Sequence, residues 1–170
     1  MHLVKHVNTG KTLHCIVFLS IVYCLAFGFG VYMSHGEASN ANFIKINFFD
    51  LLLHNMQHLF IMLCVGLITF GIGSTFLLAV NALNTGSAVI LVFNADGILP
   101  ILTNFLPHCI FEIVSTILFA SLGLLSLNIL LSISHKGLFN KIYSILKGNA
   151  VILFFACFLL LIAALVESME

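Results

Sequence analysis

The feature that most constrains this chain is a series of long apolar segments that carry almost no charge. The first extends from Leu13 to Met33, and a helix of about 20 apolar residues is enough to cross the hydrocarbon core of a bilayer. Charged residues make up 7% of the 170 residues, whereas a soluble globular domain carries roughly 25%. The mean hydropathy is +1.19. The sequence therefore predicts a polytopic, all-helical membrane protein and excludes a soluble domain.

The apolar segments predict a bundle of about five transmembrane helices, one of them broken. The broken helix is expected where Asn94–Gly97 and Pro100 interrupt the apolar pattern. Its unpaired backbone groups must face protein or a wet cavity, so it either crosses as two half-helices or dips in and returns. The predicted spans are residues 13–33, 58–80, 82–106 (broken), 108–133 and 150–166.

Lysine placement decides between these two paths. Residues 1–11 and residues 134–149 both carry lysines, which favours a cytoplasmic position for each segment. Residues 82–106 must then cross, which gives five spans with the N-terminus inside and the C-terminus outside. Residues 1–11 are a cytoplasmic N-terminus, and residues 12–170 are expected to form a single membrane domain in the bilayer.

A polar cluster stands at the head of the fourth span. Pro107 suits the first turn of a helix, and His108 and Glu112 are spaced i, i+4, so they share one face. A carboxylate within a membrane helix costs about 3 kcal/mol at the bilayer centre, so Glu112 is either a functional group or part of a pair that orients a packed helix. The same face continues through small and polar residues and is expected to contact protein: Ser115, Thr116, Ala120 and Gly123.

Four features together resemble the integral-membrane stage II sporulation protein M family. They are Asn55 before the second span, the glycine-rich second span itself, the break at Asn84-Thr85-Gly86, and the stretch Leu106-Pro107-His108-Cys109-Ile110-Phe111-Glu112. Cys109 stands where the family has glycine, and Ile113-Val114-Ser115 replaces Leu-Pro-Ala. The resemblance singles out Asn55, Asn84, Gly86, Pro107, His108 and Glu112 as the polar cluster of structural or functional residues.

The resemblance implies a non-enzymatic membrane protein of the bacterial cytoplasmic membrane. One branch of the family works in forespore engulfment beside peptidoglycan-degrading enzymes. Other members are accessory proteins for circular-bacteriocin maturation, secretion or immunity, often beside an ATP-binding transporter subunit. The implied partners are therefore other membrane proteins, cell-wall hydrolases or such a subunit, and the oligomeric state stays open.

A more specific hypothesis is that the histidines near the second span belong to a metal-binding site. His54 and His58 are spaced i, i+4, and with His108 and Glu112 they would make a four-ligand set for an intramembrane hydrolase. The alternative is that both histidines are polar residues at the membrane surface, and no cofactor is expected. The formal net charge of zero gives no support to nucleic-acid binding.

We expect a protein that scaffolds or gates partners through the polar face of span 108–133 and the broken segment. The alternative is a transporter-like conduit, because Asn84, Asn94 and Asp96 are predicted to lie at membrane depth around the broken helix. No phosphate-binding loop is present in the sequence, so the energy for transport would come from another subunit.

Overall fold

The computed structural model describes residues 9–36, 48–126, 143 and 147–169. Most of the predicted cytoplasmic N-terminus and of the lysine-containing segment 134–149 lies outside these ranges, as do residues 127–133 of the fourth predicted span. Five helices within the described part are long and apolar enough to cross a membrane. The prediction of a multi-pass, all-helical membrane protein is confirmed, and the described residues contain no strand.

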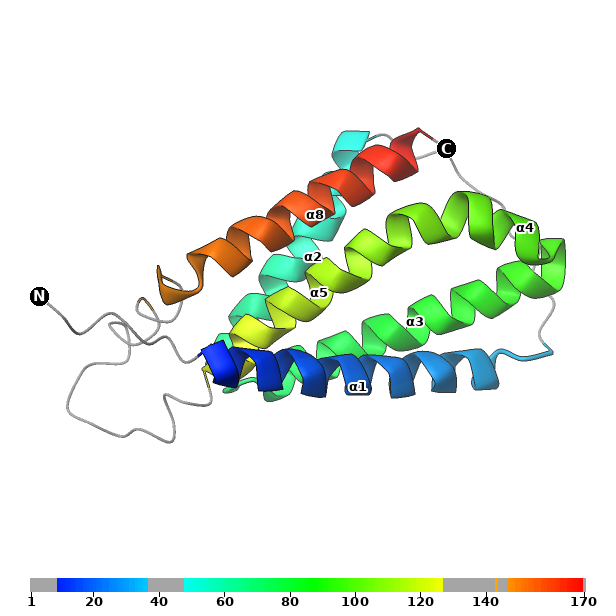
Figure 1. The fold of residues 1–170 in the computed structure, drawn as a ribbon. Coiled ribbons are helices and arrows are strands. Elements are labelled where there is room, and N and C mark those ends of the chain that lie inside the picture. Colours follow the sequence, from blue (N-terminus) through cyan, green and yellow to red (C-terminus); the bar gives the residue numbers. More distant parts are fainter. Residues whose placement is uncertain (1–8, 37–47, 127–142, 144–146, 170) are drawn as a thin grey trace, which may run out of the picture.

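The long helices run alternately in opposite directions (Figure 1). The start of α1 and the end of α8 lie at opposite ends of the bundle, as an odd number of crossings requires. Which end faces the cytoplasm stays a prediction from lysine placement. The long helices are α1 (Thr9–Met33), α2 (Phe48–Ile68), α3 (Ile72–Asp96), α5 (Leu106–Leu125) and α8 (Ala150–Ser168).

The turn between the second and third helices lies earlier than the sequence suggested. We predicted spans 58–80 and 82–106, but α2 ends at Ile68 and α3 continues through residues 81–86 to Asp96. The chain reverses at Phe70 (φ 53°) and Gly71 (φ 91°), and the second value is a left-handed conformation that glycine adopts without steric cost. A Cβ atom on Gly71 would also lie 2.6 Å from the Leu124 Cα atom, so the turn and α5 approach closely.

One helix is interrupted, as predicted, but it is joined to α5 and does not form a separate span. Gly97 (φ 79°) ends α3, and a single 28-residue apolar helix follows over Ile98–Leu125. It consists of α4 (Ile98–Pro100), a π-helical turn η1 (Ile101–Phe105) and α5. A π-helical turn takes up one extra residue without ending the helix.

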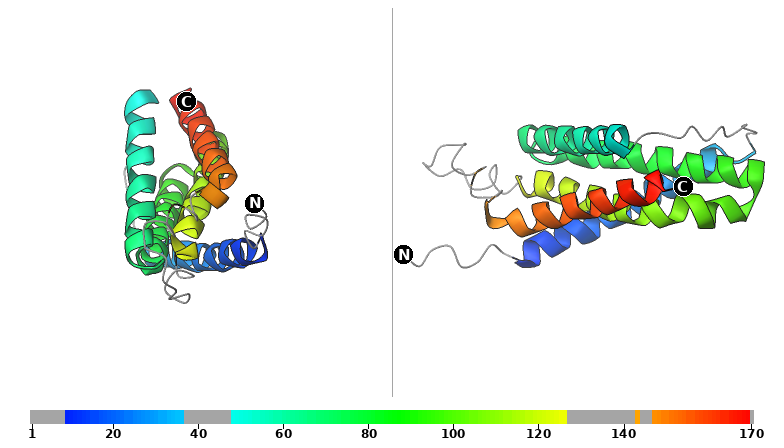
Figure 2. Two further views of the ribbon diagram at one scale, coloured as in Figure 1. Left: turned by 90° about the vertical axis from the view of Figure 1, so that its left-hand side faces the viewer. Right: turned by 90° about the horizontal axis from the view of Figure 1, so that it is seen from above.

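α5 is the central helix of the bundle. It packs against each of the other four long helices. Of the 18 residues that define the apolar stretch of Ile98–Leu125, 56% are buried, against 28% or less in the other four spans. The end-on view in Figure 2 places α5 between α8 and the pair α1 and α3. It contributes to two apolar cores, one with α1, α2 and α3 and one with α2 and α8. These cores contain Leu19, Met62, Leu78, Ala82 and Ile117, and Leu59, Leu63, Phe119, Leu122 and Leu160, respectively.

Serine hydroxyls join α3 and α5 to neighbouring helices. Each lies within hydrogen-bond distance of a backbone carbonyl of another helix, an interaction worth about 1 kcal/mol in a membrane protein. The Ser74 and Ser126 hydroxyls share their one proton with a nearer local carbonyl, Gly71 O (3.0 Å) and Gly123 O (2.6 Å), respectively. Because the carbonyls belong to intact helices, these bonds draw the backbones together without breaking helical structure. The bonds are Ser87 Oγ to Gly30 O (3.3 Å), Ser74 Oγ to Ala120 O (3.3 Å), Ser126 Oγ to Gly66 O (3.1 Å) and Ser115 Oγ to Ala156 O (2.8 Å).

The α1–α3 contact depends on two glycines. These helices run in the same direction (Figure 1), and Cβ atoms tilt toward a helix N-terminus. A Cβ on Gly30 would therefore collide with the Leu83 carbonyl, and a Cβ on Gly86 with the Phe27 carbonyl. Only glycine permits this backbone approach at either position.

Candidate functional site

Pro107, His108 and Glu112 open α5 directly after the π-helical turn. Pro107 lies in the first turn of α5, as predicted. The His108 ring packs edge-on against Phe105 of the turn, with ring centroids 5.6 Å apart. His108 and Glu112 both lie within α5, are separated by one helical turn and are half-buried.

Glu112 is the centre of a set of polar side chains drawn from four helices. It interacts electrostatically with Glu167 of α8, with His108 of its own helix and with His54 of α2. The Tyr23 hydroxyl of α1 interacts with Glu112 in the same way. We call Tyr23, His54, His108, Glu112 and Glu167 the Glu112 cluster. These interactions link three residues predicted from the sequence, His54, His108 and Glu112, with two that were not, Tyr23 and Glu167.

The polar face beyond Glu112 contacts protein, as predicted. Ser115 and Thr116 are 0% and 1% exposed, and Ala120 and Gly123 are also buried. Ser115 donates to α8, and the Thr116 hydroxyl donates to the Glu112 carbonyl within α5 (2.7 Å). The protein that this face contacts is, however, the chain's own bundle. Ser115 to Gly123 are therefore packing residues and present no surface to another molecule.

The other residues singled out from the sequence lie apart from the Glu112 cluster. Gly86 is buried in the α1–α3 contact, so its role is close packing and not the predicted break. Asn84 is exposed on α3 and Asn55 is half-buried on α2. The Thr85 hydroxyl donates to the Asn81 carbonyl one turn earlier (2.9 Å), so this polar segment is part of the continuous helix α3.

The metal-ligand set is not assembled. His54 and His58 lie one turn apart on α2, as the spacing required, and His54 is near Glu112. Among the described residues, however, no three His, Cys, Asp or Glu side chains are placed so that they could hold a metal ion. His58 interacts with His54, and its Nε2 atom is buried and makes no hydrogen bond to any described residue.

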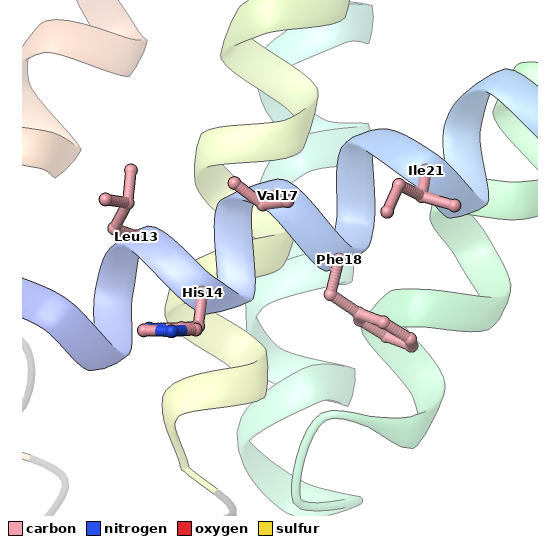
Figure 3. Close-up of a pocket in the computed structure, with 5 residues that line it drawn as sticks. All are labelled: Leu13, His14, Val17, Phe18 and Ile21. Atoms are coloured by element: carbon pink, nitrogen blue, oxygen red, sulfur yellow. The ribbon is translucent and has the colours of Figure 1, made fainter.

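A shallow apolar pocket lies on α1, away from the Glu112 cluster (Figure 3). Its lining consists of side chains from two successive turns of that one helix. No other described helix contributes to it and no residue of the predicted site lines it, so this pocket lies on the exposed outer face of α1. The lining residues are Leu13, His14, Val17, Phe18 and Ile21.

The comparison with known families gives one match. The profile described as "Stage II sporulation protein M" matches residues 16–169, a range that contains α2, α3, α4, η1, α5, α8 and most of α1. Comparisons with curated proteins and with solved structures gave no match. The match includes every residue of the Glu112 cluster and both glycines of the α1–α3 contact. This multi-pass membrane protein belongs to the stage II sporulation protein M family.

Proposed function

We propose that this chain is a non-enzymatic component of a protein assembly in the bacterial cytoplasmic membrane, and that the Glu112 cluster is its contact with a partner. The observation that carries the proposal is the position of Glu112. It is a half-buried carboxyl group on the central helix, and ionisable side chains of helices α1, α2 and α8 interact with it electrostatically. Ionisable side chains at membrane depth are costly, so they mark functional sites more often than packing sites.

The burial pattern supports a scaffold. The small and polar residues from Ser115 to Gly123 are buried against other helices of the same chain. By contrast, His54 is exposed, and His108 and Glu112 are half-buried. A partner can therefore reach His54, His108 and Glu112 without opening the bundle, whereas Tyr23 is buried. The family supports two roles for such a contact: a scaffold in engulfment with cell-wall hydrolases, or an accessory in circular-bacteriocin maturation, secretion or immunity.

The second candidate is a conduit that works with an ATP-binding subunit. The interrupted helix over Ile98–Leu125 favours it, because broken helices often line transport paths. The polar side chains expected to line such a path lie on the outside of the bundle, since Asn84, Asn94 and Asp96 are all exposed. The Glu112 cluster therefore supports the scaffold more strongly.

The test is co-purification of native partners from membranes of the producing cell. Glu112→Ala should lose a partner that the wild-type chain recovers, while the variant itself stays folded by gel filtration and circular dichroism. Asp96→Asn is the matched control, because it also removes one carboxylate but at an exposed position at the end of α3. Equal partner recovery by wild type and Glu112→Ala would contradict the proposal. ATP-dependent flux in reconstituted vesicles would favour the conduit.

A further inference from the structure

Helix α2 exposes a row of polar side chains on the outside of the bundle. Asp50, His54 and Gln57 are spaced i, i+4 and i+7, so they share one face of the helix, and all three are exposed. Gln57 is central on this face, because Gly66, about two and a half turns further along, points the opposite way and is buried. α2 lies at the edge of the bundle in the end-on view (Figure 2). No other helix in the described part of the chain covers Gln57.

The packing of α2 against α8 places Gln57 deep in the bilayer. Leu59 of α2 belongs to the same apolar cluster as Ala156 and Leu160, which lie in the middle of α8. α8 has 19 residues. Such a helix is about 28 Å long and needs nearly its whole length to cross a hydrocarbon core of about 30 Å. Gln57 is two residues from Leu59, a rise of about 3 Å, so its amide lies near the middle of the hydrocarbon core.

An exposed amide at this depth is unfavourable in lipid. Lipid chains offer no hydrogen bond, and the glutamine side chain is too short to reach the headgroups. Leu53 and Phe60, which flank Gln57 on the exposed face, are 68% and 64% exposed, but these side chains are as stable in lipid as against protein. Glutamine, in contrast, forms hydrogen bonds between transmembrane helices. The amide of Gln57 is therefore the group that requires a neighbouring helix.

The chemistry of this face suits a second copy of the same chain. A glutamine amide both donates and accepts, so it is complementary to another glutamine and needs no counter-charge. Two copies with the same orientation in the bilayer close into a pair about a two-fold axis along the membrane normal, and the central residue of the contact then meets its own equivalent. Leu53 and Phe60 lie about one turn before and after Gln57, as apolar residues flank the polar residue of a coiled-coil seam.

We propose that this protein forms a symmetric homodimer in the membrane through α2, with Gln57 of each copy hydrogen-bonded to Gln57 of the other. His54 lies at the edge of the contact. Asp50, in the first turn of α2, is about 13 Å along the helix axis from Leu59, so its carboxylate lies near the membrane surface and stays hydrated. The dimer depends neither on Glu112 nor on the partner proposed above.

Single-molecule photobleaching of the full-length chain in lipid vesicles tests the dimer. The wild type should show two copies per spot, and Gln57→Leu should weaken the dimer about tenfold, the effect of losing hydrogen bonds between helices. Gln57→Asn keeps an amide and should retain the dimer. Asn84→Leu is the matched control, because it removes an exposed amide from the middle of α3 and should leave the dimer unchanged.

Oxidative cross-linking of the same membranes locates the contact. Phe60→Cys should raise the yield of disulfide-linked dimer above that of the wild type, whereas Phe76→Cys, 66% exposed on α3, should not. A wild type that stays monomeric at every protein-to-lipid ratio would overturn the proposal. So would a dimer that survives Gln57→Leu unchanged, a dimer lost equally in Asn84→Leu, or equal cross-linking at both cysteine positions.

Discussion

Polar and small residues serve two purposes in this bundle, and the two parts of α5 show the difference. From Ser115 to Gly123 they are buried, and Ser115 bonds to a backbone carbonyl of α8. At His108 and Glu112 they are half-buried and interact with ionisable side chains of other helices. Both parts continue one face of one helix. The kind of neighbour, backbone carbonyl or ionisable side chain, separates the packing residues from the proposed functional site.

The largest effect should come from the α1–α3 contact. Gly86→Leu places a side chain against the Phe27 carbonyl, and backbone atoms cannot move aside cheaply. We expect a loss of about 3 kcal/mol or more, or failure to fold, because overpacking of this kind forces backbone shifts. Thermal unfolding in detergent, followed by gel filtration, measures it.

Gly28→Leu is the matched control for this change. Gly28 lies on the same helix as Gly30, and a Cβ atom there would meet nothing within 4 Å. Its unfolding temperature should stay close to that of the wild type. Equal damage from both substitutions would show that any added bulk is harmful and that the close contact has no special role.

A smaller loss is expected at the α5–α8 contact. Ser115→Ala removes the bond to the Ala156 carbonyl and should cost about 1 kcal/mol in the free energy of unfolding. Ser20→Ala removes a hydroxyl whose bond within the described part of the chain is local, to the Ile16 carbonyl of its own helix (2.9 Å), and should cost less. Chemical denaturation of both variants would compare them. A Ser20 effect as large as that of Ser115 would remove the distinction between interhelical and local bonds.

The sequence predicted the fold class well because hydrophobic length is a direct physical requirement of the bilayer. Residues 13–33 and 150–166 correspond closely to α1 and α8. The position of the turn between α2 and α3 was harder to predict. Small and polar residues occur both where a helix ends and where two helices pack closely, and the sequence alone does not distinguish these two roles. Asn84-Thr85-Gly86 resembled a break and is helical, whereas the turn depends on Gly71 inside an apolar run.

The candidate site was predicted in part for a similar reason. His108 and Glu112 share a local spacing, so their proximity follows from helix geometry alone. Tyr23 and Glu167 come from helices far away in the sequence, and only tertiary packing brings them to Glu112. The predicted metal set of His54, His58, His108 and Glu112 is not assembled. Helix geometry places His54 and His58 on one face, but local spacing alone does not bring a third ligand from another helix close to them.

The most direct test of the division within α5 measures partner recovery and stability in the same membranes for Glu112→Gln and Ser115→Ala. Glu112→Gln keeps the side-chain shape and should change the free energy of unfolding by less than about 1 kcal/mol, a typical range for a partly exposed site. We predict that Glu112→Gln loses the partner while remaining stable, and that Ser115→Ala keeps the partner while losing stability. The reverse pattern, or equal loss of the partner by both variants, would contradict the assignment of Glu112 as a functional residue.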